Sequence, residues 1–197
     1  MGEEIEVIDP DGFLLTVRLD HISPERVEGD VVSERVHQPE PVAHITVAVA
    51  NLPAPALELV LSRCTEVGAF AFHVVQAERS MARGAKTERW NTICREAAML
   101  AGRLKVPRVE GPSTLDQVVS TAADAVLLVR GASTHLADLS EPRDLTLLVG
   151  PEGGWTDAEF AGAHAGGFRE ASLGKLILRT ETAVVAALAS INYALGE

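Results

Sequence analysis

The chain has 197 residues, of which 47% are hydrophobic and 23% charged, and its 17 basic and 28 acidic residues give a formal net charge of −11. Such a composition can bury a core, which excludes a wholly disordered chain. Apolar runs such as residues 125–129 are far shorter than the roughly 20 residues of a membrane-spanning helix, which excludes a transmembrane protein. Residues 1–6 lack the basic start and apolar run of a secretory signal, so a cytoplasmic protein is expected.

Two cysteines, Cys64 and Cys94, fall on the apolar faces of predicted helices. We therefore expect two buried free thiols, since free cysteine is among the most buried residue types. The six histidines form no close pair, and neither CxxC nor HExxH occurs. No structural or catalytic zinc is expected.

Residues 1–40 have the pattern of three short β segments, over residues 5–8, 13–19 and 26–34. The sequences DPDG at residues 9–12 and SPE at residues 23–25 separate these segments and predict turns. Three short strands are too few for an independent barrel. These forty residues hold 3 basic and 11 acidic residues, so they carry −8 of the net charge. Pro39 and Pro41 then predict a junction, which divides the chain into domains of residues 1–40 and 41–197.

From residue 45 onward, predicted strands and helices alternate. Continuous apolar runs predict buried strands over residues 45–50, 71–75, 125–129 and 145–149. Apolar residues at helical spacing predict helices over residues 57–67 and 87–104, and a short helix from Ser113. Strands that are apolar throughout are expected when helices cover both faces of a sheet. The predicted fold class is α/β with a mostly parallel sheet.

A glycine-rich loop, GPEGG at residues 150–154, follows the last of these strands. Thr156 and Glu159 have the spacing of a capping box, so a helix is expected to begin at Thr156. The loop therefore leaves the sheet in a fixed direction, at the edge where α/β proteins bind ligands, and its glycines let the backbone approach a ligand closely. Because Glu152 would repel a phosphate, the loop favours a neutral or cationic ligand. A tight turn in which the glycines serve geometry alone is the alternative.

The chain ends with the segment SLGKLILRTETA at residues 172–183 and a helix that is apolar nearly all round through Leu195. A helix of this kind must be buried on more than one side. Few elements remain to cover it at the end of the chain, so we predict a homodimer through the C-terminal helix. An ordinary core helix is the alternative.

Basic residues concentrate between residues 79 and 108, which hold eight Lys and Arg against two Glu within an acidic chain. This cluster is consistent with contacts to a nucleic-acid backbone. A solvated helix face is the alternative. The candidate RNA contacts are Arg79, Arg83, Lys86, Arg89 and Arg103.

The loop at residues 150–154 and the segment LGKLILRTETA at residues 173–183 together resemble the signature pair of the RsmE family. That family methylates a uridine of small-subunit ribosomal RNA at ring nitrogen N3. Weaker similarity extends over residues 40–197. The resemblance implies a SPOUT-type fold with a C-terminal trefoil knot, S-adenosyl-L-methionine as cofactor, an obligate homodimer, and ribosomal RNA or the small ribosomal subunit as partner. It also implies that residues 1–40 are part of a PUA-like β-barrel.

By the same resemblance, Arg179 and Glu181 are the expected catalytic residues. Arg179 would stabilise negative charge on the uracil carbonyl, while Glu181 would accept the N3 proton or hold Arg179 in place. A structural ion pair at the start of the last helix is the alternative. The residues expected to hold the cofactor are Leu128, Val149, Gly150, Gly153, Gly154, Leu173, Gly174, Ile177, Leu178 and Thr182.

Three features depart from the family pattern. The barrel is partial, Ala56 stands where the family usually has lysine, and Met99-Leu100 replaces a usual Glu-Gln pair. These departures leave a second function open, that of a catalytically weakened relative that binds S-adenosyl-L-methionine and acts as an RNA or ribosome binding module. A phosphate-binding hydrolase is disfavoured, because the sequence offers neither a nucleophile–base pair nor a P-loop lysine.

Overall fold

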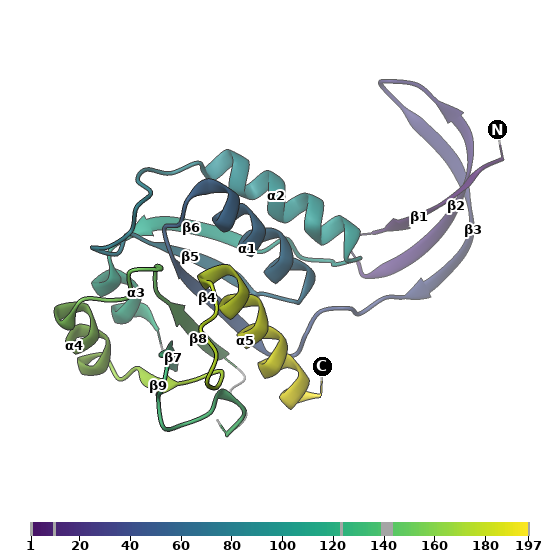
Figure 1. Cartoon of the computed structure of the whole chain (residues 1–197). Coiled ribbons are helices and arrows are strands. Elements are labelled where there is room, and N and C mark those ends of the chain that lie inside the picture. The colour runs from purple at the N-terminus through teal and green to yellow at the C-terminus, as the bar shows by residue number, and fades with distance from the viewer. Residues whose placement is uncertain (1, 10, 123, 139–143, 197) are drawn as a thin grey trace. The chain divides into compact units, whose positions relative to one another are not determined.

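The computed structural model describes residues 2–9, 11–122, 124–138 and 144–196 (Figure 1). Contacts between residues divide the chain into two units. The N-terminal unit comprises Met1–Glu40 together with Gly102–Lys105, and the C-terminal unit comprises Pro41–Ala101 and Val106–Glu197.

The N-terminal unit is built on three antiparallel strands in the order β1 (Glu4–Ile8), β2 (Phe13–Ile22) and β3 (Val27–Val36). Every residue of β3 is exposed. Glu40 accepts hydrogen bonds from the Arg103 side chain at 2.6 Å and from the Lys105 backbone N–H at 2.9 Å. Burial raises the pKa of the Glu40 carboxyl, but these hydrogen bonds outweigh burial and hold the pKa below its usual value.

The C-terminal unit is an α/β layer structure around a six-stranded parallel sheet, which confirms the predicted fold class. Apolar strands such as β4 and β8 lie in its centre and form the core. In sheet order the strands are β6 (Arg108–Ser113), β5 (Ala71–Val75), β4 (His44–Ala50), β8 (Asp144–Val149), β7 (Ala125–Leu128) and β9 (Arg169–Ala171).

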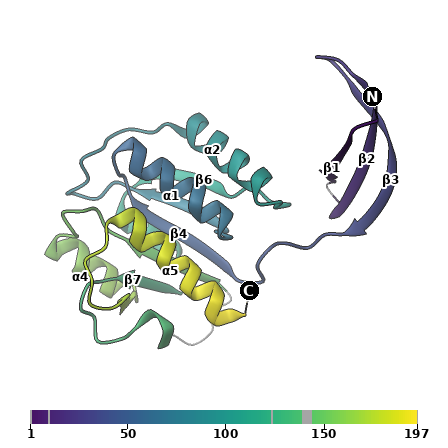
Figure 2. The same cartoon turned by 45° about the vertical axis from the view of Figure 1, so that its right-hand side comes forward.

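Helices lie on both faces of this sheet. α1 (Ala54–Glu66) packs between α2 (Thr87–Leu100) and α5 (Thr180–Leu195), and Figures 1 and 2 show the three side by side. α3 (Leu115–Thr121) packs with α4 (Asp157–Ala165). The direction of the crossovers explains this division. From β4 the chain moves through α1 to β5 and through α2 to β6, toward one edge of the sheet. The connections through α3 (β6 to β7) and α4 (β8 to β9) run toward the opposite edge. Because such connections are right-handed, α1 and α2 lie on one face of the sheet and α3 and α4 on the other.

Helix and strand ends differ from the predictions where glycine, proline or short length weakens the pattern. α2 ends at Leu100 rather than at residue 104, because Ala101 caps it and Gly102 follows with φ +67°. Thr114 caps α3, so that helix begins at Leu115, after the predicted Ser113. The edge strands β6 and β9 were not predicted, since β6 contains Gly111 and Pro112 and β9 has three residues.

The C-terminal segment emerges beside the loop that follows β7. β9 pairs with β7, the Ser172 N–H donates to the Thr134 carbonyl oxygen at 2.9 Å, and the Leu136 N–H donates to the Ser172 carbonyl oxygen at 3.0 Å. A short 3₁₀ helix, η1 (Leu136–Asp138), then packs against α5. Residues 139–143 come next in the sequence and lie outside the described residues, as does any part of the predicted knot that falls on them.

Cys64 on α1 and Cys94 on α2 are both buried, as predicted, and no disulfide joins them. Burial raises the pKa of the Cys64 thiol to about 12, so this thiol stays protonated and unreactive at neutral pH. Among the described residues, no helix is long and apolar enough to span a membrane.

The buried contact between α1 and the sheet gives a stability prediction. Leu61 is 0% exposed on α1, so Leu61→Ala should lower the free energy of unfolding by about 2–5 kcal/mol through lost burial and a residual cavity. Leu100 is 86% exposed on α2, and Leu100→Ala should change the free energy by less than about 0.5 kcal/mol. Urea denaturation measures both, and equal effects would contradict the assignment of α1 to the core.

Candidate active site

A cavity of about 460 Å³ lies at the carboxyl ends of β7 and β8. This volume falls in the range of roughly 300–1,000 Å³ found for small-molecule and cofactor sites. Its walls come from residues 128–130, residues 149–155 and the segment 173–180, with Phe160 of α4 and Ala183 of α5. The cavity therefore lies where parallel α/β sheets bind ligands.

The loop at residues 150–155 is shaped by close contacts. A Cβ added at Gly150 would lie 2.8 Å from Trp155 Nε1, so the indole lies against this glycine and leaves no room for a side chain. Gly154 has φ +70°, and its N–H donates to the Pro151 carbonyl oxygen at 2.8 Å. The glycines at positions 150 and 154 are therefore required by packing and by backbone conformation.

The predicted capping box is present where this loop enters α4. The Thr156 hydroxyl accepts the Glu159 N–H at 3.3 Å, and the Glu159 carboxylate accepts the Thr156 N–H at 2.8 Å. This reciprocal pair satisfies two backbone donors at the helix start. It fixes the downstream end of the glycine-rich loop.

The second glycine-bearing segment, residues 173–179, forms the opposite wall. Gly174 has φ +106°, and a Cβ added there would find no atom within 4 Å. Leu176 and Ile177 line the cavity but are 80% and 78% exposed. At the end of this segment, the Thr180 hydroxyl donates to the Gly150 carbonyl oxygen at 3.1 Å. The glycine-rich loop at residues 150–154 and the glycine-bearing segment at residues 173–179 therefore meet at one cavity.

Nine of the ten expected cofactor residues line the cavity: Leu128, Val149, Gly150, Gly153, Gly154, Leu173, Gly174, Ile177 and Leu178. Thr182 does not line it and is exposed. Thr180 lines the cavity instead, because two residues along an α-helix turn the side chain by about 200°.

Sequence reasoning also missed Arg130, Trp155 and Phe160, which line the cavity. Trp155 and Phe160 flank the Thr156 cap at the spacing of a hydrophobic staple, a signal that could have assigned them to the site. Arg130 comes two residues after the end of β7, and Gly150 comes directly after β8. Because ligands bind at the carboxyl ends of parallel strands, Arg130 could have been assigned to the site for the same reason as Gly150.

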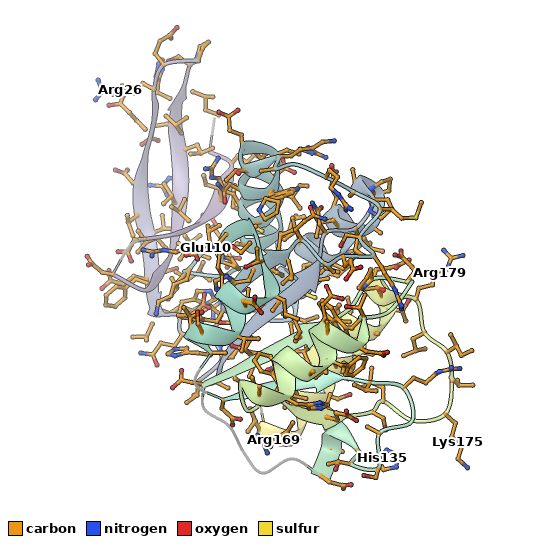
Figure 3. The ribbon with its side chains drawn as sticks, turned by 90° about the vertical axis from the view of Figure 1, so that its left-hand side faces the viewer. Arg26, Glu110, His135, Arg169, Lys175 and Arg179 are labelled. Carbon is orange, nitrogen blue, oxygen red and sulfur yellow. The ribbon has the colours of Figure 1, made fainter. Side chains whose placement is uncertain are left out.

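Arg179 and Glu181 lie next to the cavity without lining it. Arg179 precedes α5, and its side chain is 85% exposed. Figure 3 shows Arg179 and Lys175 extending from the segment into solvent. Nη1 of Arg179 lies 3.9 Å from Oε1 of Glu181, whose side chain is 15% exposed. Glu181 occupies the first turn of α5, where a carboxylate interacts favourably with the helix dipole.

The candidate RNA contacts have different surroundings. Arg83 donates to the carbonyl oxygens of Ser80 and Ala82 in its own loop, and Lys86 is exposed just before α2. Arg89 pairs with Glu58 at 2.8 Å, and hydrogen bonding to this carboxylate raises the pKa of the Arg89 guanidinium.

Arg103 and Arg79 make structural contacts. The Arg103 side chain is 6% exposed and paired with Glu40 in the N-terminal unit, so its guanidinium is not presented at the surface. Arg79 donates through Nη1 to the carbonyl oxygens of Gly153, at 2.9 Å, and Trp155, at 3.2 Å. Arg79 therefore contacts the glycine-rich loop directly.

The cavity is suited to a ligand that has an apolar part and charged or polar groups. Leucine and aromatic side chains form its apolar walls, while Glu152 and Arg130 add one charge of each sign. At Gly154 and Gly174 the backbone leaves open space. Within the described residues, no cluster of His, Cys, Asp and Glu has the arrangement of a metal site.

Comparison with known proteins agrees with this geometry. A family profile described as "RNA methyltransferase domain" matches residues 38–192. Ribosomal RNA small subunit methyltransferase E of Synechocystis sp. is 36% identical over 97% of this chain, which spans 66% of that protein's length. A crystal structure of ribosomal RNA small subunit methyltransferase E from Neisseria gonorrhoeae bound to S-adenosyl methionine is 30% identical, with a TM-score of 0.88, covering 98% of this chain and 83% of that one.

The fold class is also found in more distant proteins. The SpoU methyltransferase AviRb from Streptomyces viridochromogenes, 15% identical, superposes with a TM-score of 0.51 over 76% of this chain and 60% of its own. The fold is that of the SPOUT methyltransferases, as predicted. The chain belongs to the RNA methyltransferase family of ribosomal RNA small subunit methyltransferase E, or RsmE.

The hydrogen bond between the two cavity walls can be tested by an isosteric change. Thr180→Val removes the donor to the Gly150 carbonyl oxygen and should lower the free energy of unfolding by about 0.5–1.5 kcal/mol. Thr87→Val makes the same change at the exposed first residue of α2 and should have almost no effect. Chemical denaturation of both variants gives the comparison, and equal losses would show that the 3.1 Å contact does not join the walls.

Proposed function

We propose that this chain catalyses the S-adenosyl-L-methionine-dependent methylation of uridine N3 in small-subunit ribosomal RNA. The observation that carries the proposal is the meeting of two glycine-bearing segments at one cavity of cofactor size. The name of the Synechocystis relative supports the ribosomal RNA substrate. The S-adenosyl methionine in the Neisseria structure supports the cofactor.

The cavity would hold the cofactor through backbone and apolar side chains. When bound there, S-adenosyl-L-methionine supplies a methyl group activated by a positively charged sulfur. Gly150, Gly153, Gly154 and Gly174 let the backbone approach it, and Thr180 keeps the two walls together. The Glu152 carboxylate gives this edge of the cavity a negative charge that favours a cation.

With the cofactor bound, uridine N3 would form a bond to the methyl carbon as the bond between that carbon and sulfur breaks, and the N3 proton would pass to the Glu181 carboxylate or to water. The protein's main contribution is alignment of these atoms. Arg179 donates a hydrogen bond to the uracil carbonyl oxygen, on which negative charge develops. Glu181, less exposed and 3.9 Å from Arg179, holds the guanidinium in position or accepts the N3 proton.

RNA would approach over the loop that precedes α2, which carries Arg83 and Lys86, and over the start of α2, which carries Arg89. Arg83, Lys86 and Arg89 provide cationic groups there within a chain of net charge −11. Their contribution to RNA affinity should fall as salt rises, because phosphate contacts release counterions. Arg103 is left out of this surface because its side chain is 6% exposed.

A homodimer through α5 completes the proposal. Thr182, Ala189 and Tyr193 are exposed along one stripe of α5, and the exposed Leu176 and Ile177 also present apolar surface. A second copy would bury these groups, since exposed apolar surface favours association.

The N-terminal unit would act as part of a PUA-like β domain. The ribosomal RNA substrate implies a cytoplasmic protein.

The central test is methyl transfer to RNA. Small-subunit ribosomal RNA incubated with the protein and S-adenosyl-L-methionine should gain one methyl group on a uridine, measured by mass spectrometry of nucleosides. Cofactor binding without any added methyl, on either free RNA or the assembled subunit, would instead support a relative with weakened catalysis.

The role of Arg179 can be separated from cofactor binding. Arg179→Ala should lower kcat by about 10²–10³-fold, as expected for loss of a donor to a developing oxyanion, and should change the cofactor Kd less than about twofold. Lys175→Ala removes another exposed cation from the same segment and serves as the matched control. Retained activity of Arg179→Ala would remove this residue from the mechanism.

The dimer can be tested through α5 alone. Ala189→Arg places a long cation on the exposed face of α5 and should convert a dimer into the 20.9 kDa monomer, measured by light scattering. Ala161→Arg makes the same change at an exposed position of α4 and should leave the dimer intact. A monomeric unsubstituted protein would contradict the proposed assembly.

A further inference from the structure

Arg79 is attached to the glycine-rich loop on both sides of Gly154. Its Nη1 atom donates to the Gly153 carbonyl oxygen at 2.9 Å and to the Trp155 carbonyl oxygen at 3.2 Å. Gly154 between them has φ +70° and donates its own N–H to Pro151. These contacts determine which way the peptide groups at positions 153 and 155 point.

The aliphatic part of Arg79 also contacts this loop. A Cβ added at Gly153 would lie 3.4 Å from Arg79 Cβ and 3.5 Å from its Cδ. The arginine stem therefore covers one side of Gly153, a residue that lines the cavity. Arg79 itself does not line the cavity.

A second link comes from the neighbouring residue. The Glu78 N–H donates to Oε1 of Glu159 at 2.8 Å, while Oε2 of Glu159 accepts the Thr156 N–H at 2.8 Å. Arg79 thus holds the loop after β8 at positions 153 and 155, and Glu78 holds the first turn of α4 at Glu159. A charged donor and a charged acceptor make these bonds stronger than neutral ones.

We propose that Arg79 is a positioning residue for cofactor binding: it holds the Gly153–Trp155 turn in the conformation that binds S-adenosyl-L-methionine. This inference rests on the proposed function and assigns Arg79 a role through the protein backbone. Arg79 lies outside the cavity, so it acts without touching the cofactor. Affinity depends on it because a loop that is already ordered loses less conformational entropy on binding.

The structure also separates Arg79 from the other cations of its loop. Arg83 binds carbonyl oxygens within residues 80–82, and Arg89 pairs with α1. Nε and Nη2 of Arg79 have no hydrogen-bond partner among the described residues, so the guanidinium keeps donors free for an RNA phosphate. Removing Arg79 should therefore weaken cofactor binding even when no RNA is present, unlike removal of a residue that contacts only RNA.

The experiment measures the Kd of S-adenosylhomocysteine by calorimetry in the absence of RNA. Arg79→Met keeps most of the stem against Gly153 and removes the two hydrogen bonds that Nη1 donates. It should weaken binding about 10- to 30-fold, the change expected from losing one to two hydrogen bonds. Arg79→Lys restores a cationic donor and should recover part of the loss. Arg95→Met removes an equal charge from an exposed position of α2 and should leave the Kd unchanged.

Each outcome is decisive when thermal unfolding is measured in parallel. A weaker Kd in Arg79→Met with partial recovery in Arg79→Lys, and with little change in Tm, supports the inference. Unchanged binding in Arg79→Met, or weakening that Arg95→Met reproduces, overturns it while leaving the proposed function intact. If the unsubstituted protein does not bind S-adenosylhomocysteine, the proposed function fails first and the inference fails with it.

Discussion

The hydrogen bond from the Thr180 hydroxyl to the Gly150 carbonyl oxygen joins segments thirty residues apart and determines the geometry of the cavity. Its position follows from the parallel sheet. β7 and β8 are neighbours, so the loops at their carboxyl ends open on the same edge, and α5 begins where it can contact them. Without this contact, the glycines at positions 150, 154 and 174 could keep their backbone conformations, but the two loops that carry them would not be held together around one cavity.

Charged side chains serve different local needs within each unit of the chain. Glu159 orders the start of α4, Arg79 holds the glycine-rich loop from outside, and Arg103 is buried against Glu40 in the N-terminal unit. These three charged side chains therefore stabilise the structure, although a count of basic and acidic residues does not distinguish them from charges that contact a ligand. The exposed Arg179 is different, because its guanidinium extends into solvent beside the cavity.

Much of this arrangement could be predicted where residues close together in the sequence determine the local structure. The buried strands have continuous apolar runs, Thr156 and Glu159 have the spacing of a reciprocal cap, and both glycine-bearing segments stand out in the sequence. The weaker elements were missed for physical reasons: β9 has three residues, and β6 contains glycine and proline at a sheet edge. Thr182 was chosen over Thr180 because a sequence motif does not give the direction in which a helix presents a side chain. The contact of Arg79 with Gly153 spans 74 residues, so no local pattern could indicate it.

Amide NMR of the protein labelled with ¹⁵N only at glycine tests the account most directly, because the two walls are marked by glycines. On titration with S-adenosyl-L-methionine, the signals of Gly150, Gly153, Gly154 and Gly174 should shift together at one ligand per chain. The signal of Gly29, in the N-terminal unit, should not move. Shifts at residues 150–154 without any at Gly174, or no shift at either segment, would contradict a shared cofactor site.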